Sequence, residues 1–184
     1  MQIIDLFTAK KKTIQDAAAL LVKGFKKHWP NAWPTMDVAQ REVEEFQAAD
    51  RICRAAVENN GTLLGWIGGI SEYNGKTWEL HPIIVHPQHQ RNGIGRALVA
   101  DLEKQVKKRG GITIFLGTDD ENNMTTLSGI DLYLNIFEHI ANIKNLKGHP
   151  YEFYQKLGFV IVGVIPDANG FGKPDIIMAK RIKE

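Results

Sequence analysis

The sequence predicts an α/β protein with a mixed, mostly antiparallel sheet flanked by helices. One observation is that apolar residues at helical spacing alternate along the chain with short β-like runs. Another is that the pairs Asn60-Gly61 and Asn74-Gly75 separate three successive β-like runs, which is typical of antiparallel hairpins. The 184 residues contain no repeat and no linker-like segment, so we expect a single domain over residues 1–184.

The composition excludes several classes of protein. Hydrophobic residues make up 43% and charged residues 24%, and 23 Lys and Arg nearly balance 21 Asp and Glu, so no nucleic-acid partner is expected. No apolar run approaches the ~20 residues of a membrane span, so no membrane partner is expected either. The single cysteine, Cys53, fits a cytoplasmic protein without disulfides. No His or Cys cluster has zinc spacing, so no metal is expected.

The first third of the chain should contain one strand and two helices. Gln2–Phe7 has the pattern of a strand, and Thr13 is a candidate N-cap for the helix that follows. The apolar face of that helix has helical spacing: Ile14, Ala17, Leu21 and Phe25. Two Trp-Pro pairs in residues 28–34 predict a loop, after which Asp37 is a candidate N-cap for the second helix.

The middle of the chain should form three strands and a long helix. The strands Arg51–Asn59, Thr62–Tyr73 and Thr77–His86 should form an antiparallel meander through the two Asn-Gly turns. Gly93–Arg109 then has helical periodicity, with Ala97, Leu98, Leu102 and Val106 on its apolar face. Gly110-Gly111 should end this helix.

The last third of the chain should alternate between strands and helices. Ile112–Leu116 is all apolar, as expected for a strand covered on both sides. The other elements expected here are a polar loop, two helical segments and two final strands: Gly117–Asn123, Leu127–Ile143, Tyr151–Leu157, Phe159–Ile165 and Ile176–Ile182.

The segment between the third strand of the meander and the long helix has the pattern of an anion site. Its residues are Gln90, Arg91, Asn92, Gly93, Ile94 and Gly95. Backbone N–H groups at a helix N-terminus have no partner within the helix, and the helix dipole favours negative charge there. Glycines let the backbone approach a pyrophosphate closely, and Arg91 and Arg96 add positive charge. The alternative is a glycine-containing helix entry that binds nothing.

Two commoner phosphate loops are excluded by spacing. The chain contains no G-x-x-x-x-G-K-[ST] motif, so a P-loop is excluded. The dinucleotide fingerprint needs a third glycine, and Leu98 occupies that position.

Glu79 is the candidate catalytic base. It interrupts an apolar strand directly before the predicted anion site, where a carboxylate has no packing role. His81 lies two residues further, so strand geometry places both side chains on one face, where His81 could orient the substrate. The alternatives are an edge-strand glutamate that faces water and a structural histidine before Pro82.

Two motifs resemble the GNAT superfamily of N-acetyltransferases. The segment from Gln90 to Gly95 is similar to its acetyl-CoA pyrophosphate loop, and His149–Phe159 is similar to its aromatic-rich helix ending in Leu-Gly-Phe. The resemblance implies acetyl-CoA as cosubstrate and an acetyltransferase fold. It also implies that Tyr154 points at the cofactor sulfur as the catalytic acid. The alternative for Tyr154 is a core tyrosine.

A narrower set of motifs resembles the aminoglycoside 6'-N-acetyltransferases of Gram-positive bacteria. The motifs are Trp78–Pro82, Arg109–Ile114, Leu116–Asp120, Thr125–Ser128, His149–Tyr154, Pro166–Gly170 and Lys173–Ile176. By this resemblance Glu79 engages the 6'-amine, and Gln90 to Arg96 hold the pyrophosphate. The backbone of Ile83, Ile84 and Val85 holds the thioester and the pantetheine arm. Trp29 and Tyr73 match aromatic positions that line the antibiotic site, and a homodimer is implied.

Aminoglycosides are polycations, so their site should be rich in carboxylates. Candidate acids for it are Glu42, Glu45, Asp119, Asp120, Glu121, Glu138 and Asp175. Asn122 falls where the family resemblance implies an acid after the Thr-Asp-Asp turn, and we expect it to line the substrate site with Asp119, Asp120 and Glu138.

Two other functions remain open at this stage. An acetyltransferase of the same chemistry could act on a polyamine or on a protein or peptide amine. A non-catalytic acyl-CoA sensor would be a binding module instead, and it would need neither the base Glu79 nor the acid Tyr154.

Overall fold

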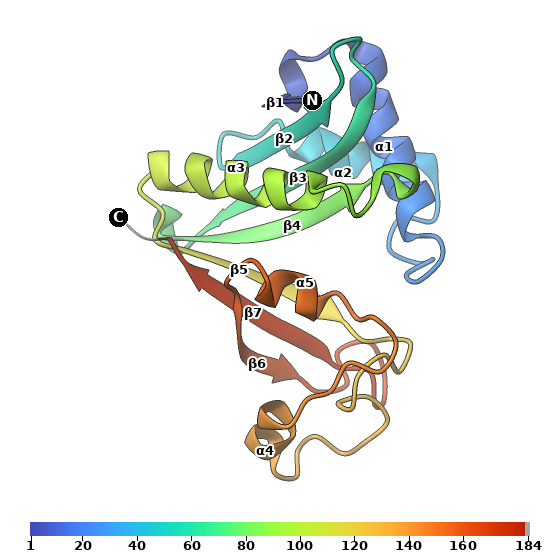
Figure 1. Cartoon of the computed structure of the whole chain (residues 1–184), viewed down its shortest axis with the longest axis vertical. Coiled ribbons are helices and arrows are strands. Elements are labelled where there is room, and N and C mark those ends of the chain that lie inside the picture. The colour runs from blue at the N-terminus through green and yellow to red at the C-terminus, as the bar shows by residue number, and fades with distance from the viewer. Residues whose placement is uncertain (183–184) are drawn as a thin grey trace. The chain divides into compact units, whose positions relative to one another are not determined.

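The computed structural model describes residues 1–182 of the chain, which form two compact units. The first unit contains Met1–Ile114 and Ile182, and the second contains Phe115–Arg181 (Figure 1). The expectation of a single domain over residues 1–184 stays a prediction.

The first unit contains a four-stranded antiparallel meander. Its strands pair in chain order: β1 (Gln2–Asp5), β2 (Arg51–Val57), β3 (Leu63–Glu72) and β4 (Thr77–Val85). The predicted meander and the mostly antiparallel class are therefore confirmed. At the β3–β4 turn, Tyr73 and Asn74 adopt left-handed conformations, with φ of 48° and 55°. The predicted first strand is shorter than expected, because Leu6–Thr8 forms a 3-10 turn.

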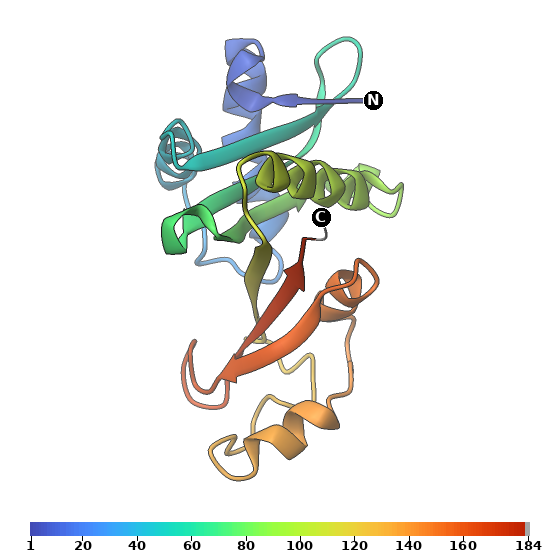
Figure 2. The ribbon, with the colours of Figure 1, turned by 90° about the vertical axis from the view of Figure 1, so that its left-hand side faces the viewer.

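Helices cover both faces of this meander, as Figures 1 and 2 show. They are α1 (Lys11–Phe25), α2 (Met36–Glu45) and α3 (Ile94–Lys108). Two neighbouring glycines of β3 indicate which helices cover which face. A side chain at Gly68 would meet Phe46, directly after α2, whereas a side chain at Gly69 would meet Leu102 of α3. Because successive side chains of a strand point to opposite faces, α2 and α3 lie on opposite faces.

Two predicted N-caps are wrong. Thr13 lies within α1, whose N-cap is Lys10, and the buried Thr13 hydroxyl donates to the carbonyl oxygen of Gly61 at 3.2 Å. The N-cap of α2 is Thr35, whose hydroxyl accepts from the amide of Val38 at 3.4 Å. Asp37 is the second residue of that helix, and its negative charge in the first turn complements the helix dipole.

The core between α1, α2 and the meander is centred on Trp66. This side chain is fully buried, and its Nε1 donates to the carbonyl oxygen of Ala17 at 3.1 Å, which satisfies its only polar group. Cys53 of β2 belongs to the same cluster and is 3% exposed. Burial raises the pKa of the Cys53 thiol well above its usual range. Cys53 is therefore an inert packing residue.

The second unit combines three strands with two short helices. The strands stand in the order β5 (Thr113–Asp119), β7 (Asp175–Arg181) and β6 (Val160–Ile165), and β6 pairs antiparallel with β7. The helices are α4 (Ile136–Ala141) and α5 (Tyr151–Gln155). Strand β5 begins in the first unit and continues into the second.

Two predictions for the second unit need correction. Residues 117–119 continue β5, so the predicted polar loop begins later than expected. The predicted helix Leu127–Ile143 is helical only in α4. Helical geometry fails earlier because Gly129 and Asn135 have φ of 75° and 56°. None of the helices in residues 1–182 is both long enough and apolar enough to cross a membrane.

Candidate active site

Strand β4 presents a polar face beside a buried one. Trp78, Leu80 and Ile84 are buried, whereas Glu79 and His81 are half-buried in the alternating pattern of the strand. The two candidate residues therefore lie on one face, as predicted. Beyond the register shift in this strand, Ile84 pairs with Trp66 and lies in the core on the side covered by α1 and α2, whereas Ile83 and Val85 point to the other side.

His81 takes part in a small polar cluster with two residues before and within α2. We call Trp33, Glu42 and His81 the Glu42 cluster. Trp33 Nε1 donates to Glu42 Oε2 at 3.3 Å, and Glu42 Oε1 lies 3.5 Å from His81 Nε2. The Trp33 and His81 rings also approach, with centroids 5.8 Å apart. Glu42, expected as one acid among several, is thus bound to the histidine of the candidate site.

Charges around the Glu42 cluster shift the pKa of both titratable members. Burial alone would lower the pKa of His81, but the hydrogen bond to Glu42 and the charges of Glu42 and Glu79 raise it above 6.5. Burial would raise the pKa of Glu42, and its bond to His81 outweighs this and lowers that pKa below 4.5. The favoured state is therefore an ionised Glu42 beside a histidine of increased basicity.

Gly68 allows the backbone of His81 to come close to β3. A Cβ at Gly68 would collide with the carbonyl oxygen of His81 and with the ring of Phe46. The β3–β4 register shifts between Ile67 and Gly69, opposite this point. A residue without a side chain is thus required where β4 carries its polar residues.

The predicted anion site is an exposed turn that leads into α3. Gly93 is the N-cap, with φ of 79° and no side chain accepting from the first turn, and the space beside its Cα is open. Arg91 also has a left-handed φ of 64°. Ile94 is buried and anchors the turn, whereas Arg91, Asn92 and Arg96 are exposed. The turn thus offers uncapped N–H groups and two arginines to an anion.

Gln90 holds the turn to the end of β4. Its Nε2 donates to the carbonyl oxygen of Val85 at 3.3 Å, which ties the two predicted cofactor-binding segments together. Gly95 lies in the first turn of α3 and is half-buried. The residues present fit the pyrophosphate of acetyl-CoA, because the turn combines an open helix N-terminus with positive charge.

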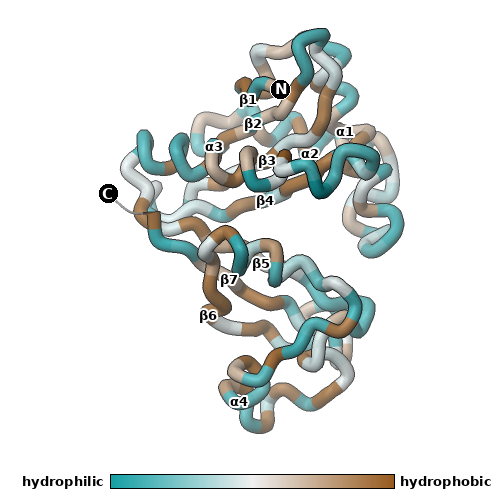
Figure 3. The backbone as a smooth tube through the Cα atoms, in the orientation of Figure 1, coloured by the Kyte–Doolittle hydropathy of each residue, from teal (hydrophilic) through white to brown (hydrophobic). Residues whose placement is uncertain are grey.

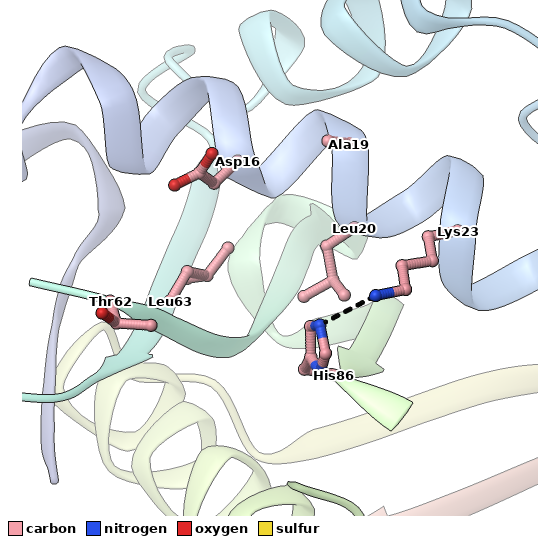
Figure 4. Close-up of a pocket in the computed structure, with 7 residues that line it drawn as sticks. All are labelled: Asp16, Ala19, Leu20, Lys23, Thr62, Leu63 and His86. Atoms are coloured by element: carbon pink, nitrogen blue, oxygen red, sulfur yellow. Dashed lines mark hydrogen bonds between the residues drawn. The ribbon is translucent and has the colours of Figure 1, made fainter. Parts of the chain in front are cut away.

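His86 supports the same segment and was not expected from the sequence. It follows β4, and its Nδ1 accepts from the amide of Gln88 at 3.3 Å. Its Nε2 lies 3.1 Å from Lys23 Nζ in a pocket of about 260 Å³ on α1 (Figure 4). Burial, with the charge of Lys23, lowers the pKa of His86, which favours the neutral ring whose Nδ1 accepts from Gln88. No sequence pattern pairs residues so far apart in the chain.

Tyr154 of the second unit is suited to donate a proton. It lies on α5 and is 8% exposed, packed against the rings of Phe153 and Phe159 at 5.1 and 5.8 Å. Burial raises the pKa of its hydroxyl well above 10, so the group stays protonated at neutral pH. A protonated phenol is the form that a catalytic acid needs.

His149 positions the start of α5, a role that the motif alone did not indicate. Its ring is 2% exposed, and its Nδ1 accepts from the amide of Tyr151 at 3.2 Å. Its Nε2 therefore carries the hydrogen and donates to the carbonyl oxygen of Asp119 at 3.1 Å. The bond that Nδ1 accepts needs the neutral ring, and burial lowers the pKa of His149 below 6.5.

We expect the stability of the second unit to fall in acid because of His149. In the unfolded chain His149 takes up a proton at its ordinary pKa of 6.5, whereas in the folded protein burial lowers that pKa. The contribution of the neutral ring to the free energy of unfolding is therefore fully present above pH 6.5 and is lost as the pH falls through the lowered pKa. Denaturant unfolding of wild type and His149→Asn between pH 5 and pH 8 measures this. The difference in free energy of unfolding between wild type and His149→Asn should become smaller as the pH falls. Parallel curves would contradict the role.

The predicted acidic residues of the second unit differ in their surroundings. Asp120 is fully buried, and its two oxygens accept from the amides of Met124 and Thr125, each at 2.7 Å. This arrangement favours a structural role for Asp120. Asp119 is half-buried and accepts from Asn169 at 2.5 Å. Asn122 and Glu138 are exposed, so their side chains are accessible.

The two aromatic candidates belong to the first unit. Trp29 is half-buried, with its ring centroid 5.9 Å from that of Phe25, and Tyr73 is 77% exposed at the β3–β4 turn. The structure thus brings Glu42, Glu79 and His81 together, while Tyr73 lies in the turn before β4. Among residues 1–182, no three His, Cys, Asp or Glu side chains form a group that could hold a metal ion.

Comparison with known proteins identifies the family to which the chain is similar. Residues 18–133 match the model of the acetyltransferase (GNAT) family. No curated protein matches significantly.

Three solved structures are similar over the whole chain. An aminoglycoside 6'-N-acetyltransferase complexed with coenzyme A has 46% identity and a TM-score of 0.91, covering 100% of this chain and 98% of its own. The aminoglycoside 6'-N-acetyltransferase from Enterococcus faecium has 45% identity and a TM-score of 0.86, with the same coverage. An aminoglycoside 6'-acetyltransferase type Ii has 39% identity and a TM-score of 0.73, covering 100% and 99%.

Proposed function

The chain belongs to the acetyltransferase (GNAT) family, and from this we propose that it acetylates the 6'-amine of aminoglycosides. The fold is the acetyltransferase fold, with the predicted mixed sheet, and the enzyme is an acetyl-CoA-dependent N-acetyltransferase. What we propose beyond this activity is the identity of the acceptor, the 6'-amine of an aminoglycoside.

The observation that carries the acceptor proposal is the full-length likeness to aminoglycoside 6'-N-acetyltransferases at 39%, 45% and 46% identity. The local chemistry supports it. Glu42 and Glu79 place negative charge around one face of β4, and a polycationic amine is attracted to such a site. We propose that Trp29, Tyr73, Asp119, Asn122 and Glu138 add contacts to the antibiotic, and we leave the buried Asp120 out of this set.

The residues divide the proposed reaction into binding and proton transfer. Bound acetyl-CoA supplies the acetyl group as a thioester. The turn from Gln90 to Arg96 binds its pyrophosphate, and the backbone of Ile83 to Val85 holds the pantetheine arm. Glu79 binds the acceptor amine and helps to remove its proton, because only the neutral amine has a lone pair for attack. Tyr154 donates its phenolic proton to the departing sulfur.

The acceptor is tested by release of the CoA thiol from acetyl-CoA. We expect release with kanamycin-type compounds that carry a free 6'-amine and none with analogues lacking that amine. The KM for the antibiotic should rise with salt, because exposed opposite charges are screened over ~8 Å at physiological ionic strength. The rate should rise with pH until the bound amine is neutral.

The same assay separates the alternatives. Release with polyamines or peptides but not with kanamycin-type compounds would contradict the aminoglycoside proposal and leave the acetyltransferase chemistry in place. Binding of acetyl-CoA without release for any amine in the panel would instead favour a sensor.

We also propose that the enzyme is a cytoplasmic homodimer. Strand β6, which is largely brown in Figure 3, stands at the end of the strand order in the second unit. Its exposed apolar residues are Val160, Val162 and Ile165, at 61%, 58% and 52%. A second copy would remove them from water. The cytoplasm supplies acetyl-CoA and suits a free cysteine. Analytical ultracentrifugation should give twice the chain mass of 20.7 kDa, and Val162→Lys should give the monomer. A wild-type monomer would refute the dimer.

A further inference from the structure

The Glu42 cluster restricts the protonation of His81. Trp33 Nε1–H can only donate, and it uses Oε2 of Glu42 at 3.3 Å. The remaining oxygen, Oε1, faces His81 Nε2 at 3.5 Å. An ionised carboxylate can only accept, so the Nε2 atom that faces it must carry a hydrogen. A neutral imidazole has a single N–H, and therefore its lone pair is on Nδ1.

We propose that Glu42 is a positioning residue for acetyl transfer: it fixes the proton of neutral His81 on Nε2 and so leaves Nδ1 to take the proton that the acceptor amine loses. The proposal rests on the function proposed above, because it assumes that an ammonium group arrives beside Glu79. It extends that function, since neither the family likeness nor the sequence motifs give Glu42 a part in the reaction.

The proton transfer balances without another reactant. One N–H bond of the acceptor ammonium breaks, and its electron pair stays on the nitrogen, which then attacks the acetyl carbonyl. The proton bonds to Nδ1 of His81, directly or through Glu79 or water, and gives an imidazolium ion. The side chain of His81 is 41% exposed, so solvent can accept the proton afterwards.

The surrounding charges suit this role. Glu42 on α2 and Glu79 on β4 both favour the imidazolium ion, whereas Arg51 on β2 and burial oppose it. The carboxylates outweigh the opposing effects. The arrangement resembles in logic the carboxylate that orients a catalytic histidine and stabilises its charged form. The side chain of Glu42 is 21% exposed, and its two oxygens face Trp33 and His81, which hold it in this position.

Glu42→Gln tests the proposal because it preserves shape and changes the donor pattern. The Gln oxygen must accept from Trp33, so its NH₂ group faces His81 Nε2. That atom must then accept, and the proton of the neutral ring moves to Nδ1, where it blocks the proposed base. Nitrogen NMR of the ring should show the Nε2–H tautomer in wild type and the Nδ1–H tautomer in the variant. His81→Gln identifies the signals.

Kinetics should follow the tautomer. We expect kcat/KM of Glu42→Gln to fall on the order of tenfold on its high-pH plateau. Its acidic limb should move to lower pH, because His81 loses a neighbouring negative charge. A loss of packing alone would lower the plateau without moving the limb. The double change Glu42→Gln, Trp33→Phe frees the Gln oxygen for His81, so it should restore the Nε2–H tautomer and part of the rate.

Glu44→Gln is the matched control, because Glu44 is an exposed glutamate of the same helix and should leave both tautomer and kinetics unchanged. A wild-type ring with its proton on Nδ1 would overturn the proposal, even if no variant folds. Wild-type kinetics in Glu42→Gln with a changed tautomer would overturn it too. Absence of thiol release by the wild type would instead refute the proposed function, and the ring signals would still report the tautomer.

Discussion

Gly95→Val should weaken acetyl-CoA binding by about 10- to 100-fold in a protein that remains folded, because one or two charge-assisted hydrogen bonds would be lost. Gly95 lies within the first turn of α3, next to the left-handed N-cap Gly93. A β-branched side chain there would keep the pyrophosphate away from the N–H groups of the turn. Gly95 is a better test than Gly93, whose φ of 79° would strain any other residue.

Isothermal titration with acetyl-CoA measures this effect, and circular dichroism checks the fold. Ala100→Val is the control, since Ala100 is exposed on the same helix and the change introduces the same β-branched side chain there. Normal affinity in a folded Gly95→Val protein would remove the pyrophosphate from this turn.

Glu79→Gln and Tyr154→Phe should each slow turnover, by up to ~10²-fold where the proton transfer limits the rate. Glu79→Gln removes the charge that holds and deprotonates the amine, so kcat/KM for the amine should fall while acetyl-CoA binding stays normal. Tyr154→Phe removes the only polar atom of a buried ring, so kcat should fall through slower thiolate departure.

Single-turnover kinetics with both substrates separates these two effects, and titration with acetyl-CoA alone is the control. The Tyr154 variant should recover with thioesters whose leaving thiols are more acidic, since those thiolates need no proton. Wild-type rates in both variants would exclude Glu79 and Tyr154 from the proton transfers.

The sequence predicted the elements that depend on local patterns. Two Asn-Gly turns and alternating apolar residues were sufficient for the β2–β4 meander, and helical periodicity was sufficient for α3. The helix expected over Leu127–Ile143 is interrupted by the positive φ of Gly129 and Asn135, and the amide of Gly129 donates to the distant carbonyl oxygen of Gly172 at 2.9 Å. Such a bond depends on tertiary structure, which periodicity does not report.

The candidate site was predictable where a motif has a fixed spacing. Glu79 and His81 are two residues apart on a strand, so their shared face followed from the sequence. The pairing of Glu42 with His81 did not follow, because these two residues lie in segments that are far apart in the chain. Lys23 with His86 and His149 with Asp119 are of the same kind.

Because Cys53 is buried, its reaction with a thiol reagent can report local unfolding of the first unit. A thiol reagent detects free CoA, and the only protein thiol is 3% exposed with a raised pKa, so the folded enzyme adds almost no background to that reading. After turnover has been measured, slow labelling of Cys53 would measure how often the core of the first unit opens. Acetyl-CoA should slow that labelling if it binds the folded unit, so one reagent can report both catalysis and ligand-linked stability.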